Sequence, residues 1–117
     1  MKAIVTLITT LFATASIASD VEIVDVQASK NGATWRFDVT LRHADTGWEH
    51  YADAWEILAP DSTSLGMRVL VHPHETEQPF TRSLSGVAVP EGIPLVIIRA
   101  RDNVDGWTEK TFEYLLP

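Results

Sequence analysis

Apolar and polar residues alternate strictly between Thr34 and Arg42. The apolar positions of this segment are Trp35, Phe37, Val39 and Leu41. A period of two is typical of a β-strand with one face in the core and one in water, whereas a helix would scatter these side chains around its circumference. The pattern therefore predicts a core strand in which Trp35 is buried.

Six other short segments have the composition of strands, and turn signals separate them. An Asn-Gly pair at 31–32 is typical of a hairpin, and Pro-Glu-Gly at 90–92 suits a type I turn. The alternation slips at positions 23 and 24, which predicts a β-bulge or burial on both faces there. The six segments are 21–28, 54–59, 65–71, 80–89, 95–101 and 107–115.

Seven short strands without helical periodicity predict one all-β domain. The length of 117 residues suits a single domain. We expect a seven-stranded antiparallel β-sandwich of the immunoglobulin-like type. Beyond the second strand, the side chains expected to point inward are Trp55, Ile57, Phe112 and Tyr114.

The first eighteen residues have the pattern of a secretory signal peptide. A positive start at Met1-Lys2 precedes an apolar stretch, and Ser16-Ile17-Ala18 places small residues where a signal peptidase reads them. We expect cleavage before Ser19, a folded domain over 19–117, and a periplasmic or secreted protein. The apolar stretch is too short to remain as a membrane-spanning anchor.

Composition narrows the classes of partner. The formal net charge is −7, and an acidic domain repels nucleic acid and anionic membrane surfaces. The sequence has no cysteine, which excludes thiol chemistry, disulfide bonds and a lipid-modified cysteine. A domain of about 100 residues can bury enough surface to fold without disulfides.

The segment from Ile97 to Trp107, with Arg-Ala-Arg-Asp-Asn-Val-Asp-Gly between Ile98 and Trp107, resembles the last hairpin of fibronectin type III and related bacterial immunoglobulin-like domains. Trp35 resembles the core tryptophan of that group. No tyrosine precedes Ala100 at the position that a tyrosine corner requires. The resemblance implies the sandwich fold. The segments 47–53 and 72–82 are similar to parts of small exported bacterial proteins, which implies no particular activity.

Alternate loops of an antiparallel sandwich share one end, so the loops 43–53, 72–79 and 102–106 should lie together. These three loops, which we name the loop pole, contain all four histidines and most of the acidic loop residues. Loops on a rigid sandwich commonly carry binding sites. The predicted binding residues are Trp48, His50, Tyr51, Glu75, Glu77 and Arg82.

His72-Pro73-His74 is a candidate metal-binding pair, because residues i and i+2 of an extended chain point the same way. With His50 or Glu75 as a third ligand, these imidazoles would suit Cu or Zn. The alternative is that His72 and His74 only form hydrogen bonds at strand ends.

Two other groups of the loop pole have ordinary alternatives of their own. Glu75, Glu77 and Arg82 also fit a solvated loop face. Asp102, Asn103 and Asp105 fit either a Ca²⁺ site or a tight turn.

No nucleophile motif or paired-carboxylate cleft is evident, so we expect no enzymatic activity. The leading interpretation is an exported, non-enzymatic binding or interaction module that uses the loop pole to bind a protein or a small ligand. One alternative is a periplasmic Cu- or Zn-binding protein with His50, His72 and His74 as ligands. Another is a structural accessory domain of an envelope assembly, joined through an exposed strand edge.

Overall fold

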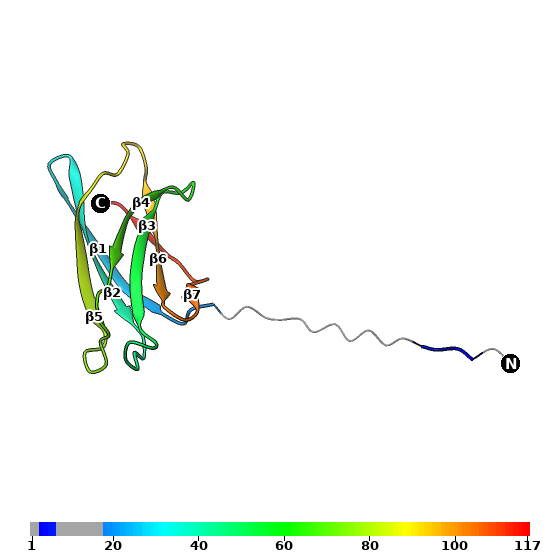
Figure 1. Ribbon diagram of the computed structural model, residues 1–117. Helices are drawn as coiled ribbons and strands as arrows, with labels where there is room; N and C mark the ends of the chain where they lie inside the picture. The colour runs from blue at the N-terminus through cyan, green and yellow to red at the C-terminus, as the bar shows by residue number, and fades with distance from the viewer. Residues whose placement is uncertain (1–2, 7–17) are drawn as a thin grey trace.

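The structure is a computed structural model that describes residues 3–6 and 18–117 (Figure 1). Within these residues the chain forms strands and no helix, so no helix is present that could cross a membrane. The predicted signal peptide lies outside the described residues except for 3–6 and Ala18. The strands are β1 (Glu22–Asn31), β2 (Thr34–Arg42), β3 (Ala52–Leu58), β4 (Ser64–Val69), β5 (Phe80–Val87), β6 (Leu95–Asp102), β7 (Gly106–Trp107) and β8 (Phe112–Leu115).

The strands form two antiparallel sheets. One sheet has the order β1-β2-β5, and the other has the order β4-β3-β6-β7 with β8 also paired to β6. The predicted all-β class is confirmed, and β1 contains a register shift between Ile23 and Asp25, as the broken alternation predicted. The first hairpin turns at Gly32, whose φ of 65° is a conformation that glycine adopts without strain.

The prediction of a single last strand over 107–115 is wrong. β7 pairs with Arg101 and Asp102, and β8 pairs with Leu95 to Ile98, so the four residues 108–111 lie opposite only two residues of β6. Thr108 still donates its N–H to the Ala100 carbonyl at 2.8 Å and also forms an isolated parallel bridge with Ser19, whereas residues 109–111 leave the ladder. The segment therefore forms two strands, which brings the total to eight.

One hydrophobic core lies between the two sheets. From β2, Phe37, Val39 and Leu41 are fully buried and Trp35 is 9% exposed, as the alternation predicted. The facing sheet contributes further fully buried side chains, among them Trp55, Ile57, Val96 and Ile98. The predicted inward residues Phe112 and Tyr114 pack against this core. The backbone N–H of Ala28 donates to the Tyr114 hydroxyl at 3.1 Å, which ties β1 to the opposite sheet.

The outer strand β4 has one buried and one open face. Met67 and Val69 are exposed, whereas Leu65 packs against the core and Leu70, directly after the strand, is buried. The apolar series at every second position from Met67 therefore faces solvent.

The loop pole predicted from the strand order is confirmed by direct contacts. Asn103, in the β6–β7 turn, accepts from the Tyr51 N–H at 2.9 Å and donates to the Trp48 carbonyl at 3.0 Å. The His74 N–H donates to Asp45 Oδ2 at 2.8 Å, which joins the β4–β5 loop to the β2–β3 loop. All three loops gather at the lower end of the molecule (Figure 1).

Candidate metal centre

Two side chains of the site continue the inward faces of core strands by one position. In β2 every second residue from Trp35 to Leu41 is buried, and the same period reaches His43, which is 4% exposed. In β6 the inward series that begins at Val96 ends on Asp102, which is fully buried. Because β2 and β6 belong to different sheets, His43 and Asp102 meet at the end of the core.

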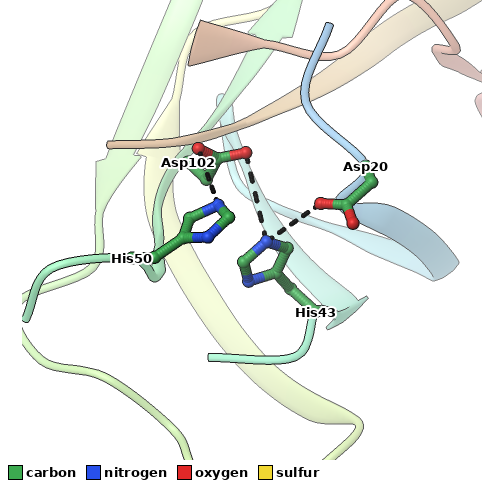
Figure 2. A group of neighbouring side chains, drawn as sticks. All are labelled: Asp20, His43, His50 and Asp102. Atoms are coloured by element: carbon green, nitrogen blue, oxygen red, sulfur yellow. Dashed lines mark ion pairs between the residues drawn. The ribbon is translucent and has the colours of Figure 1, made fainter. Parts of the chain in front are cut away.

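Asp20 and His50 complete a group of four side chains (Figure 2). Asp20 lies two residues before β1, and His50 lies in the β2–β3 loop two residues before β3. Each of the four residues offers one ligand atom, and these atoms all lie within 4.8 Å of one another.

Asp102 is held as a buried carboxylate by three hydrogen bonds. Its Oδ1 accepts from the backbone N–H of Val104 at 2.9 Å and of Asp105 at 2.7 Å, and its Oδ2 accepts from the Ser19 hydroxyl at 2.6 Å. Burial alone would raise the pKa of Asp102, but these donors and the neighbouring His50 outweigh burial and lower the pKa below its usual value. The site therefore contains a fixed negative charge.

His43 is oriented by a second buried carboxylate. Its Nδ1 lies 2.6 Å from Asp45 Oδ1, and a carboxylate only accepts hydrogen bonds, so Nδ1 carries the proton. Asp45 is itself fixed by the N–H groups of Ala52 and His74. The opposite nitrogen, Nε2, faces Asp20 Oδ1 at 3.0 Å and Asp102 Oδ2 at 4.0 Å. A carboxylate behind one ring nitrogen, with carboxylate oxygens in front of the other, is the arrangement of a metal-binding histidine and equally of a protonated histidine between carboxylates.

His50 presents a nitrogen that no hydrogen bond satisfies. Its Nε2 is buried and has no hydrogen-bond partner among the described residues. The nearest charged atoms are Asp102 Oδ1 at 3.3 Å and Asp105 Oδ2 at 3.6 Å. The ring meets that of His43 edge to face, with centroids 4.9 Å apart. A buried polar atom in a native protein normally has a partner, so a ligand at this nitrogen would remove an energetic cost.

Among the described residues, the buried carboxylates of the group have histidines as their ion-pair partners. The side chains of Asp45 and Asp102 are completely buried, and within the described residues no lysine or arginine forms an ion pair with either. Buried charges are normally paired or coordinate a metal. With both imidazoles neutral, a divalent cation between Asp20, His43, His50 and Asp102 would supply the balancing positive charge.

The structure does not bring together the histidines predicted as one metal site. His50 lies beside His43, whereas the metal-ligand group of the described residues includes neither His72 nor His74. The His74 ring stacks on Phe80 with centroids 3.9 Å apart, and Arg82 Nη2 lies 2.7 Å from its Nε2. Burial lowers the pKa of His74, and the charges of Arg82 and His72 add to that effect.

His72 is exposed at the surface. Its Nδ1 lies 3.1 Å from the carbonyl oxygen of Pro73, and its ring centroid is 4.5 Å from that of His74. The Nε2 of His74 faces a guanidinium, whereas its Nδ1 is buried without a hydrogen-bond partner among the described residues.

The predicted aromatic residues lie at the surface of the loop pole. Trp48 is 65% exposed, and the Tyr51 ring meets it edge to face at 5.7 Å. Trp48 and Glu75 border an open pocket of about 360 Å³, together with Gly47, Pro73 and Thr76.

The other predicted binding residues take part in local contacts. Glu77, which is largely exposed, lies 3.6 Å from Arg82. The Arg82 guanidinium also lies over the ring of Phe80, which is buried and adds nothing to the surface. In the β6–β7 turn Asn103 bonds to the neighbouring loop, so its oxygen forms a structural contact.

Comparison with known proteins gives one relative and no family. No family model matches the chain, and no solved structure matches it. The chain is 40% identical over 89 residues to a protein of Halomicrobium mukohataei that is described as "Putative lipoprotein". The match covers 75% of this chain and 43% of that protein, so the chain spans less than half the length of its relative.

Proposed function

We propose that this chain is an exported, immunoglobulin-like β-sandwich that binds a divalent transition-metal ion at its loop pole. The name of the relative supports export, and the signal-peptide pattern agrees with it. The chain passes between the sheets after β2, after β4 and after β5, and this exchange supports an immunoglobulin-like topology. The segment that resembles the last fibronectin type III hairpin falls on β6 and β7.

The observation that carries the metal proposal is the spacing of nitrogen and oxygen donors. Tetrahedral Zn²⁺, with bonds of about 2.0–2.2 Å, places its ligand atoms roughly 3.3–3.6 Å apart. Here the Asp20–His43 pair is separated by 3.0 Å, and Asp102 lies 3.3 Å from His50 through Oδ1 and 4.0 Å from His43 through Oδ2. With one atom from each residue, all four ligand atoms lie within 4.8 Å of one another. Small side-chain movements would therefore complete the coordination.

The ligand types define the class of metal. Two imidazoles favour Zn²⁺ or Cu²⁺ over Ca²⁺ and Mg²⁺, which prefer oxygen ligands only. Two carboxylates and no thiolate disfavour Cu⁺, which selects soft sulfur ligands. Zn²⁺ and Cu²⁺ are therefore the appropriate probes.

Calorimetric titration of the exported protein with Zn²⁺ tests the proposal. The variant Asp20→Asn removes a ligand that is 79% exposed, so it should weaken binding without disturbing the fold. Asp25→Asn is the matched control, because Asp25 is an exposed carboxylate on β1 that bonds only to the neighbouring Gln27. Equal Zn²⁺ affinity in both variants, or no binding by the unaltered protein, would contradict the proposal.

A second candidate function is recognition of a partner at the pocket beside Trp48. The Trp48 carbonyl is fixed by Asn103, so this exposed indole is presented by an ordered backbone. Rigid aromatic side chains at loop tips are typical anchors of binding surfaces. A partner that binds there should lose affinity for Trp48→Ala and keep its affinity for His50→Ala.

A further inference from the structure

We infer that removal of residues 1–18 completes the metal centre, because it frees the α-amino group of Ser19 as an additional nitrogen ligand. This inference rests on the proposed metal binding and on the predicted cleavage after Ala18. Removal of residues 1–18 would then be a chemical step in the assembly of the metal site.

Ser19 is built into the site. It is 8% exposed, and its hydroxyl donates to Asp102 Oδ2 at 2.6 Å and accepts from the Val21 N–H at 3.3 Å. Its backbone forms a bridge with Thr108, the residue directly after β7. The expected first residue of the processed chain is therefore anchored against a ligand of the proposed metal.

Covalent geometry keeps the Ser19 nitrogen near the same group. The backbone nitrogen of a serine lies within about 3.8 Å of its own hydroxyl oxygen for any rotamer. Ser19 Oγ touches Asp102, and the next residue, Asp20, reaches His43 Nε2 at 3.0 Å. The nitrogen of Ser19 therefore lies within about 6.4 Å of Asp102 Oδ2 and one residue before the proposed ligand Asp20.

Processing changes the chemistry of that nitrogen. While residues 1–18 are attached, the nitrogen of Ser19 is a peptide amide whose lone pair is delocalised into the carbonyl group. After cleavage it is an α-amino group with an ordinary pKa of about 8, which releases a proton to solvent when a metal binds. The resulting amine has a localised lone pair and can form a chelate ring with a hydroxyl or carbonyl oxygen of the same residue. The same atom therefore changes from a non-ligand into a metal ligand.

The site is open to solvent beside Ser19 and Asp20. The Asp20 side chain is 79% exposed, so the proposed coordination sphere is open toward the start of the domain. An open pocket of about 600 Å³ adjoins it, bordered by Ala18, Ser19 and residues 20–23 and by residues 108–111. Ser19 therefore borders open space on this side of the site.

The test compares two forms of the exported chain that differ only at the nitrogen of Ser19. One form begins at Ser19 with a free amine, and the other carries an acetyl group there, which restores an amide. Zn²⁺ dissociation constants are measured by competition with a chromophoric chelator. The free form should bind at least about tenfold more tightly, since even the loss of an outer hydrogen-bond partner weakens metal sites by that factor.

A spectroscopic measurement reports the ligand directly. With Cu²⁺ as the probe, ¹⁵N labelling of serine should alter the nitrogen hyperfine pattern of the free form and leave the acetylated form unchanged. Equal Zn²⁺ affinities, an unchanged hyperfine pattern, or a natural N-terminus other than Ser19 would each overturn the inference.

The two proposals fail in different ways. If both forms bind Zn²⁺ equally and Asp20→Asn weakens both, the metal centre stands and the role of the amine falls. If neither form binds, the metal centre itself is disproved. Ser19→Ala serves as a further control, because it removes the hydroxyl and keeps the amine.

Discussion

The loop pole contains two pairs of histidines with different surroundings. The rings of His43 and His50 are 4.9 Å apart, and those of His72 and His74 are 4.5 Å apart. Nitrogens of the first pair face the carboxylates of Asp20 and Asp102, whereas the second pair adjoins an arginine and stacks on an aromatic ring. Ring spacing alone therefore does not identify a metal site, and the charge of the neighbours separates a cation site from a packing contact.

Removal of a single histidine from each pair should give the largest difference. His50→Ala removes a proposed ligand and should weaken Zn²⁺ binding at least about a hundredfold. Loss of a ligand should cost at least as much affinity as loss of a hydrogen-bond partner behind a ligand. His72→Ala should leave the affinity unchanged, because His72 is exposed and lies outside the group of four. Calorimetric titration measures both. Equal losses would show that the pairs act as one site.

Zn²⁺ should stabilise the folded protein through His43 and His50 and not through His72. At a free Zn²⁺ concentration 100 times the dissociation constant, the free energy of unfolding should rise by about 2.7 kcal/mol. Thermal unfolding of His72→Ala should show this gain, and His50→Ala at the same Zn²⁺ concentration should show little of it. A gain that survives in His50→Ala would place the metal elsewhere.

Asp45→Asn tests whether Asp45 supports metal binding by positioning His43, without binding the metal itself. The asparagine side chain would place an NH₂ group where a carboxylate oxygen now accepts a hydrogen bond, either from His43 Nδ1 or from the backbone N–H of His74. Zn²⁺ affinity should fall by about 10–100-fold, as for other outer partners of a metal-binding histidine, and stability should fall by about 1–3 kcal/mol because a buried group loses its partner. Asp25→Asn, at an exposed carboxylate outside the site, is the control and should leave the Zn²⁺ affinity unchanged. Unchanged affinity in Asp45→Asn would contradict the role given to Asp45.

His74, in the second pair, should make the free energy of unfolding depend on pH. The pKa of His74 lies below 6.5 in the folded protein, because burial and the charges of Arg82 and His72 disfavour the imidazolium. Between that folded pKa and 6.5 the unfolded chain binds more protons, so this group makes the folded state less stable as the pH falls below about 6.5.

The variant His74→Gln isolates this contribution. Urea unfolding of the metal-free protein at pH 7.5 and pH 5.5 should show a smaller loss of stability on acidification in the variant than in the unaltered protein. An equal loss in both would mean that His74 does not titrate differently in the folded and unfolded states.

Much of the fold follows from residue patterns. The period of two places β2 and its buried face, the broken alternation in the first strand places the register shift, and alternate strand directions predict which loops meet. The split of the last predicted strand is not visible in the pattern, because it depends on how many residues lie opposite Arg99 and Ala100 in the ladder.

The site was only half visible in the sequence. His43 and Asp102 are detectable as polar residues at the next inward position of two apolar strands, and this signal is stronger than the His-x-His spacing. Asp20 and Ser19 gave no local signal, because Ser19 meets Asp102 across 83 positions of the chain. The His72-Pro73-His74 spacing does not reveal that the ring of His74 stacks on Phe80 and faces Arg82, because both contacts depend on the fold.

The most direct test of the account is the chemical shift of the histidine ring nitrogens, measured by long-range ¹H–¹⁵N correlation with and without one equivalent of Zn²⁺. Coordination should move the Nε2 resonances of His43 and His50 to the position of metal-bound nitrogen and leave those of His72 and His74 in place. If Zn²⁺ moved the resonances of His72 and His74 while His43 and His50 stayed unchanged, the division between the two pairs would be contradicted.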